Sequence, residues 1–120
     1  MEKPAILMID SDAAALAMCA SLLRDKGFPV YPAATEEIFA ERLREIRPGI
    51  IIVKTYAGAP ATARIMHEIS THHHCRNIPV ICYFADEDIY LLRRKIEDGR
   101  MEYQSFRSDN MDTMLQTAVS

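Results

Sequence analysis

The chain has 120 residues, of which 49% are hydrophobic and 26% are charged, and its formal net charge is −3. This length suits one domain with a buried core, and the interspersed charges leave no basic surface for nucleic acid. No apolar run is long enough to span a membrane, and no signal peptide precedes the first apolar segment. Three cysteines without metal-binding or redox spacing, Cys19, Cys75 and Cys82, indicate reduced thiols in a cytoplasmic protein.

The first part of the chain alternates short apolar runs with amphipathic segments, which is typical of βα units around a parallel sheet. The pattern predicts strands over 5–9 and 28–31 and helices over 13–26 and 36–47. Asp12 suits an N-cap of the first helix better than a metal ligand, and Gly27 ends that helix. Thr35 caps the second helix, whose inner face we expect to carry Ile38, Leu43 and Ile46.

The stretch from 47 to 54 reads Arg-Pro-Gly-Ile-Ile-Ile-Val-Lys. Four consecutive β-branched residues after a Pro-Gly breaker predict a central strand that is buried on both faces. In open α/β sheets, ligands bind just beyond the carboxyl ends of the strands. Here that end carries Lys54.

The rest of the chain predicts a helix over 61–70, a strand over 78–84, a helix over 86–99, an edge strand over 102–106 and a last helix from about Met111. The helix over 86–99 rests on the spacing of Ile89, Leu92 and Ile96. Its basic run, Arg93, Arg94 and Lys95, indicates a solvated helix face more than a docking patch. The last helix has no terminator, so residues 1–120 form one domain that is compatible with a longer protein.

These elements, in this order and spacing, resemble the receiver domain of bacterial two-component response regulators over nearly the whole chain. The resemblance is carried by 6–10, 48–53, 78–81, Ala85, Gly99 and Tyr103. It implies an α/β fold: a doubly wound five-stranded parallel sheet with strand order 2-1-3-4-5, that is, (βα)5. It also implies that Tyr103 stands at the aromatic position that turns between exposed and buried rotamers on activation.

Receiver chemistry needs two acidic residues after strand one, an aspartate ending strand three, a Thr or Ser ending strand four and a Lys ending strand five. The matching positions here are Asp10, Ser11, Lys54, Phe84 and Phe106. Only Asp10 keeps the required type. An aspartyl phosphate needs a carboxylate nucleophile and a divalent cation, and Lys54 supplies neither.

The resemblance therefore predicts a pseudo-receiver without enzymatic activity, catalytic residues or cofactor. We expect it to bind a protein partner or to homodimerise through the face of helix 4, strand 5 and helix 5, and to bind neither nucleic acid nor membrane. The alternative is an unorthodox sensor of a small ligand or metal at the altered crevice. We also expect Lys54 to pair with Asp10, and the ring of Phe84 to hold Tyr103 in an outward rotamer.

Weaker metal candidates remain beside this prediction. Asp10 and Asp12 are one such pair, and His72, His73 and His74 beside Cys75 contain good zinc donors. Adjacent residues at a helix end point in different directions, so a pH-sensitive polar loop is the alternative for the histidines. No glycine-rich phosphate loop follows any strand, and no Ser/His/Asp or Cys/His arrangement follows from spacing.

Overall fold

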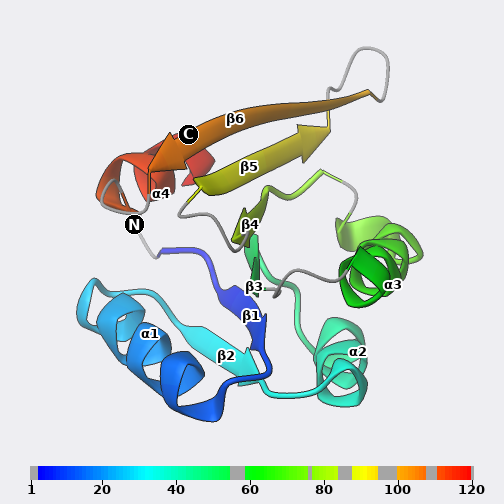
Figure 1. Cartoon of the computed structure of the whole chain (residues 1–120), viewed down its shortest axis with the longest axis horizontal. Coiled ribbons are helices and arrows are strands. Elements are labelled where there is room, and N and C mark those ends of the chain that lie inside the picture. Colours follow the sequence, from blue (N-terminus) through cyan, green and yellow to red (C-terminus); the bar gives the residue numbers. More distant parts are fainter. Residues whose placement is uncertain are drawn as a thin grey trace.

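The computed structural model describes residues 3–54, 59–75, 77–83, 88–94, 100–107 and 111–119. Its elements are β1 (Ile6–Asp10), α1 (Ala13–Asp25), β2 (Val30–Ala33), α2 (Glu36–Glu45), β3 (Ile50–Lys54), α3 (Ala59–Ser70), a 3-10 turn (His73–Cys75), β4 (Val80–Tyr83), β5 (Asp88–Arg94), β6 (Met101–Arg107) and α4 (Met111–Val119). The described strands form one sheet with the order β2-β1-β3-β4-β5-β6 (Figure 1).

The expected doubly wound, five-stranded parallel sheet is wrong in the C-terminal part of the chain. The strands β2, β1, β3 and β4 pair in parallel, but β5 pairs antiparallel with both β4 and β6. The helix expected over 86–99 is not formed at 88–94, which are strand β5. The fold is α/β, with a six-stranded mixed sheet and four α-helices in the described part of the chain.

The sequence of β5 explains why a helix was predicted in its place. Ile89 and Leu91 alternate along the strand into one core cluster, whereas Leu92 packs against the other. A strand with apolar residues on both faces also contains the three-residue spacing of a helix, here from Ile89 to Leu92. Pairing with β4 and β6 comes from distant parts of the chain, and it overrides this local signal.

The two central strands form as predicted. All five residues of β1 are buried, as are the first four of β3, and the two strands pair in parallel from Ile6–Ile50 to Asp10–Lys54. Gly49, just before β3, permits a close approach to the N-terminal segment, because a Cβ there would lie 2.5 Å from the Cβ of Pro4. Long β-branched side chains then fill both faces of the sheet.

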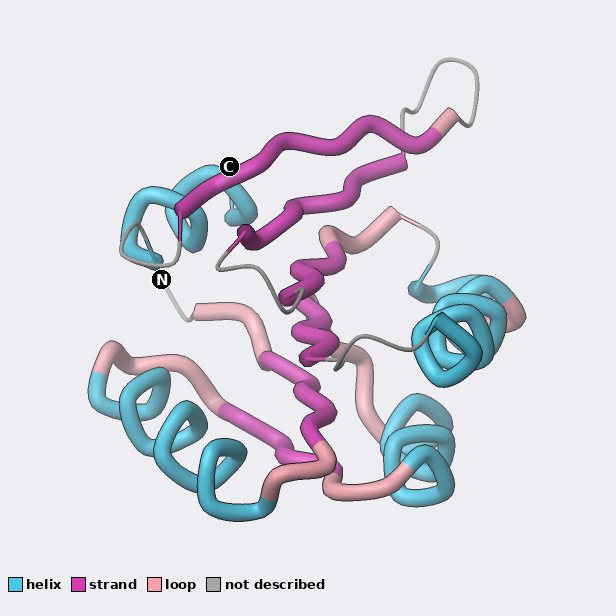
Figure 2. Tube along the Cα trace, viewed as in Figure 1, coloured by secondary structure: helices cyan, strands magenta, loops and turns pink. Residues whose placement is uncertain are grey.

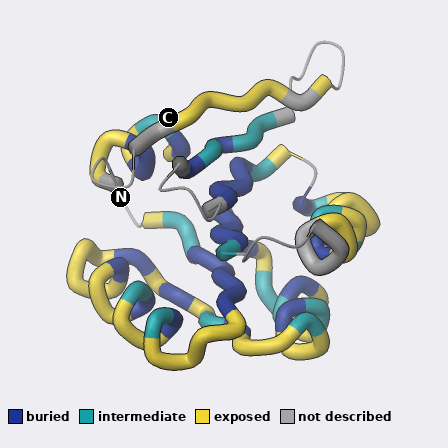
Figure 3. Tube along the Cα trace, in the orientation of Figure 1, coloured by how far each residue is buried: buried dark blue, intermediate teal, exposed yellow. Residues whose placement is uncertain are grey.

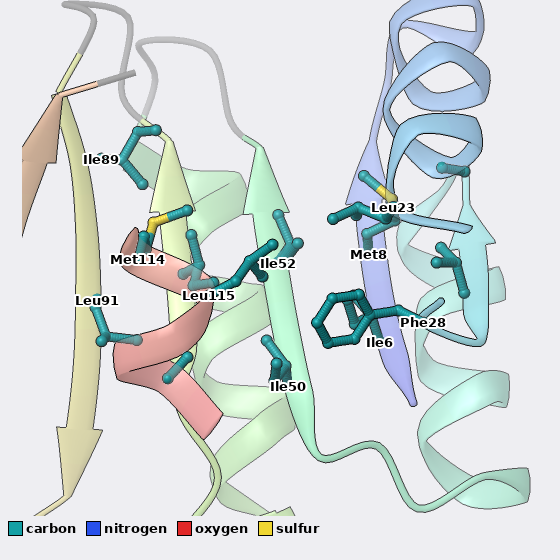
Figure 4. Packing of buried hydrophobic residues seen from close by; sticks show 14 of the residues in the cluster. Ile6, Met8, Leu23, Phe28, Ile50, Ile52, Ile89, Leu91, Met114 and Leu115 are labelled. Carbon is teal, nitrogen blue, oxygen red and sulfur yellow. The ribbon is translucent and has the colours of Figure 1, made fainter. Parts of the chain in front are cut away.

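The sheet lies between helices on its two faces (Figure 2), and it separates two hydrophobic clusters. Helices α1 and α4 cover one face, where Met114 and Leu115 meet Ile52 and Ile89 (Figure 4). Helices α2 and α3 cover the other face with residues that include Phe39, Leu43, Ile65 and Ile69.

The inner face of α2 differs from the expected one by one position. Phe39 is 1% exposed and points into the core, whereas Ile38 is 37% exposed. Leu43 is buried as predicted, and Ile46 packs partly against the same cluster. Among the described helices, none is long and apolar enough to cross a lipid bilayer.

Candidate functional site

Two parallel strands bring Asp10 and Lys54 to the same edge of the sheet. They are the last residues of β1 and β3, and the strand register sets them directly opposite each other. The carboxyl ends of neighbouring parallel strands lie about 5 Å apart, a gap that a lysine side chain spans easily. Asp10 is fully buried, whereas 31% of the Lys54 side chain is exposed.

The predicted ion pair between these residues is present. Lys54 Nζ lies 3.6 Å from Asp10 Oδ2. The other carboxylate oxygen, Oδ1, accepts a hydrogen bond of 2.9 Å from the backbone N–H of Asp12. In the described part of the chain Oδ2 accepts no hydrogen bond, so the nearby ammonium is its charge compensation. A buried carboxylate without a compensating cation would be strongly unfavourable.

Asp12 is a helix cap, as predicted. Its side chain accepts hydrogen bonds of 3.1 Å from the backbone N–H groups of Ala14 and Ala15, in the first turn of α1. This capping satisfies two of the unpaired amides at the helix N-terminus. Ser11, between the two aspartates, is exposed.

A thiol lies within the electrostatic reach of the pair. Burial raises the pKa of the Cys19 thiol, while Lys54 lowers it and Asp10 raises it by smaller amounts. Burial also raises the pKa of Cys75, and it raises that of Cys82 to about 11. The neutral thiol is therefore the favoured form at all three cysteines near neutral pH, and none is set up as a thiolate nucleophile.

Tyr103 lies on the edge strand β6 and is 71% exposed, the outward position expected from the sequence. Its ring centroid is 5.9 Å from that of Tyr90 on β5, with the two planes tilted by 59°. Sequence reasoning missed Tyr90, because it assigned this residue to a helix. Phe84 and the side chain of Phe106 lie outside the described residues.

The histidine segment makes structural contacts. His74 Nε2 lies 3.1 Å from the carbonyl oxygen of Leu43 in α2, and His72 Nε2 lies 3.5 Å from Glu68 Oε1. Across the described ranges, no three His, Cys, Asp or Glu side chains come together as a metal-binding group. His74 thus connects the turn after α3 to α2, whereas His72 contacts the last part of α3 itself.

Arg93 and Arg94, which were expected on an outward helix face, lie in strand β5. The Arg93 guanidinium donates hydrogen bonds of 2.8 Å to the carbonyl oxygens of Thr117 and Ala118, at the end of α4. It therefore caps that helix and joins it to β5. The Arg94 side chain and Lys95 lie outside the described residues.

No protein-family model matches the chain, and a comparison with curated proteins found no match. The resemblance to receivers holds at a coarser level, that of an α/β domain whose largely parallel sheet begins 2-1-3. At the carboxyl edge of that parallel part, a buried aspartate faces a lysine. This arrangement can fix the two strands together, but it offers no carboxylate at the position of Lys54.

Proposed function

We propose that this domain is a phosphorylation-independent, receiver-like signalling module that acts by binding a protein partner or a second copy of itself. The observation that supports it is the Asp10–Lys54 pair, with Nζ 3.6 Å from Oδ2. In a receiver-like crevice, the ammonium stands where a phosphoacceptor carboxylate would be. Its positive charge also takes the place of a divalent cation beside Asp10.

The chemistry of phosphoryl transfer supports the same proposal. A phosphoryl group is accepted by a nucleophilic carboxylate, and its charge is offset by a metal ion. Lys54 is a cation without a carboxylate, and exposed Ser11 provides no second acidic ligand. A module that cannot be phosphorylated has to act through a surface that is present permanently.

The partner face that the resemblance implied is not formed as expected. It included a fourth helix, and the chain forms strand β5 over Asp88–Arg94 instead. We place the binding surface on the hairpin of β5 and β6, which is held against α4 by Arg93.

Incubation of the purified chain with acetyl phosphate and Mg²⁺, followed by intact-mass measurement, tests the proposal. We expect no addition of a phosphoryl group, and no change in sedimentation when beryllofluoride and Mg²⁺ are added. The Lys54→Asp variant should also stay largely unmodified, because Ser11 still provides no second acidic ligand beside Asp10. Covalent phosphate on the unaltered chain would contradict the proposal.

The alternative function, a sensor of a small ligand or metal at the crevice, stays a prediction. Thermal unfolding measured with Mg²⁺, Zn²⁺ and common metabolites tests it. A rise in the Tm of the wild-type chain with one of these ions or metabolites would favour the sensor over the interaction module.

A further inference from the structure

The two edges of the sheet are built differently. At one edge, β2 has four residues and contains Pro32, which lacks an N–H and protects an edge from further pairing. At the other edge, β6 has seven residues, Met101–Arg107, without proline, glycine or lysine. The described side chains of β6, Glu102 to Ser105, are all exposed (Figure 3).

A long edge strand without such protection is a template for another strand. In the described part of the sheet, β6 pairs with β5 on one side, over all seven residues, and has no strand on its other side. The N–H and C=O groups directed to that side are suited to the main chain of an added strand.

The faces of the hairpin favour an aromatic partner. On one face, Ile89 and Leu91 pack in the cluster that contains Met114 and Leu115 of α4. The other face carries the contact between Tyr90 and Tyr103, whose rings are 5.9 Å apart. Exposed aromatic residues beside an open edge stabilise strand pairing when another aromatic residue lies opposite.

We propose that a second copy of this chain adds its β6 antiparallel to β6, around a twofold axis that is perpendicular to the sheet and passes beside Tyr103. This inference rests on the proposed function and identifies its partner. An axis in this direction keeps each side chain on its own face of the sheet. A residue of one copy can therefore lie opposite a residue of the other copy only if their residue numbers differ by an even number. Centring on Tyr103 sets the two Tyr103 rings opposite each other, with Tyr90 of each copy beside them.

The charges along the strand favour this register and a second copy as the occupant. Centring on Glu102 would set two carboxylates opposite each other, which is unfavourable. Centring on Gln104 would set Tyr103 opposite a serine. With Tyr103 at the centre, each Glu102 faces the neutral amide of Gln104 from the other copy, an uncharged hydrogen-bond donor.

A hollow on the α4 face of the hairpin is placed to receive that amide. It has a volume of about 540 Å³ and is lined by Leu91, Arg93, Glu102, Tyr103, Gln104 and Thr117. Glu102 lies opposite Arg93 in the register of the hairpin, and Gln104 lies opposite Leu91. In the proposed dimer, Gln104 of the second copy enters the hollow beside Glu102.

The length of the strand sets the strength of the association. With Tyr103 at the centre, Met101 to Ser105 of the two copies lie opposite each other, and five residues at a rise of about 3.4 Å give a paired edge of about 17 Å. A single strand pair of this length buries less surface than a standard protein interface. We therefore expect a reversible dimer with a Kd in roughly the micromolar range. Sedimentation velocity over a series of protein concentrations measures it directly.

Three tyrosine variants test the register. Tyr103→Lys and Tyr103→Glu each set like charges opposite each other across the axis, and each should weaken the dimer by about tenfold or more. Tyr31→Lys is the matched control, because Tyr31 is an exposed tyrosine on the other edge strand, and it should leave the Kd unchanged. An equimolar mixture of Tyr103→Lys and Tyr103→Glu should restore a dimer, because opposite charges then meet at the axis.

Circular dichroism and thermal unfolding of each variant separate a lost dimer from a lost fold. A wild-type chain that stays monomeric at several hundred micromolar would overturn the inference while leaving the proposed function intact. An equal loss of dimer in Tyr31→Lys would also overturn it. So would a mixture of the two charged variants that fails to associate although each is folded. Covalent phosphate, by contrast, would overturn the proposed function alone.

Discussion

The parallel and antiparallel parts of the sheet differ in how deeply they are buried. In the parallel part, β1 and β3 are covered on both faces, and nine of their ten residues are buried. In the antiparallel part, the described side chains of β6 are all exposed, and α4 covers one face of the hairpin. Figure 3 shows this gradient from the dark centre of the sheet to its yellow outer strand.

The two parts of the sheet therefore differ in what they position. Parallel strands that are buried on both faces hold Asp10 and Lys54 in register at the carboxyl edge of the sheet. The shallow hairpin contributes less to the core, and its backbone edge is accessible for pairing. The interaction surface that we propose on the hairpin therefore lies apart from the Asp10–Lys54 pair.

The largest expected effect is the loss of stability when a core residue of each part of the sheet is shortened. Ile52→Ala in β3 should lower the free energy of unfolding by about 3–4 kcal/mol, because Ile52 is 1% exposed among large side chains. Leu92→Ala in β5 should lower it by about 1–2 kcal/mol, because Leu92 is only partly buried. Urea unfolding of both variants measures the difference, and equal losses would contradict the gradient.

The next largest expected effect is the loss of stability when the ion pair between Asp10 and Lys54 is removed. Lys54→Ala should lower the free energy of unfolding by about 1–2 kcal/mol, because the fully buried carboxylate of Asp10 loses its compensating charge. Lys26→Ala is the control, since its ion pair with Asp112 is largely exposed and should contribute about 0.5 kcal/mol or less. Equal effects of the two substitutions would show that the crevice pair stabilises no more than a surface pair.

Calorimetric titration with Mg²⁺ sharpens this prediction. The wild-type chain should bind Mg²⁺ negligibly, Lys54→Ala weakly and Lys54→Asp more strongly, because each change leaves more uncompensated negative charge at the crevice. Appreciable binding by the wild type would mean that the ammonium does not replace the cation in solution.

Sequence reasoning succeeded where the local pattern had one interpretation. The Ile-Ile-Ile-Val run allowed only a buried strand, and Asp12 and Thr35 cap α1 and α2 as predicted. The Asp10–Lys54 pair followed from the ends of two neighbouring parallel strands. These features depend on residues close together in the chain or on a register that the hydrophobic pattern determines.

Sequence reasoning failed where strands that are distant in the chain determine the local structure by pairing. Residues 88–94 contain both a strand alternation and a helix-like spacing, and only the pairing of β5 with β4 and β6 selects the strand. Tyr90 was therefore not associated with Tyr103. The clue was the continuous apolar and aromatic run Ile-Tyr-Leu-Leu, which is also consistent with a strand that is covered on both faces.

The smallest expected effect tests the junction of the two parts, strand β4, which pairs in parallel with β3 and antiparallel with β5. Cys82 in β4 is 1% exposed, and burial raises the pKa of its thiol from 9.0 to about 11. Between these values the unfolded chain releases the thiol proton while the folded chain keeps it. Raising the pH therefore favours unfolding, and the stabilisation present below pH 9 is lost as the pH approaches 11.

Other groups also titrate in this range, so the measurement compares the wild type with Cys82→Ala at each pH. The alanine variant lacks the thiol, and its deficit in free energy of unfolding should shrink by about 1 kcal/mol between pH 8 and pH 10. Urea unfolding at both values measures the deficit. A deficit that does not change with pH would show that the thiol ionises as readily in the folded chain as in the unfolded one, and hence that water reaches the junction between the two parts of the sheet.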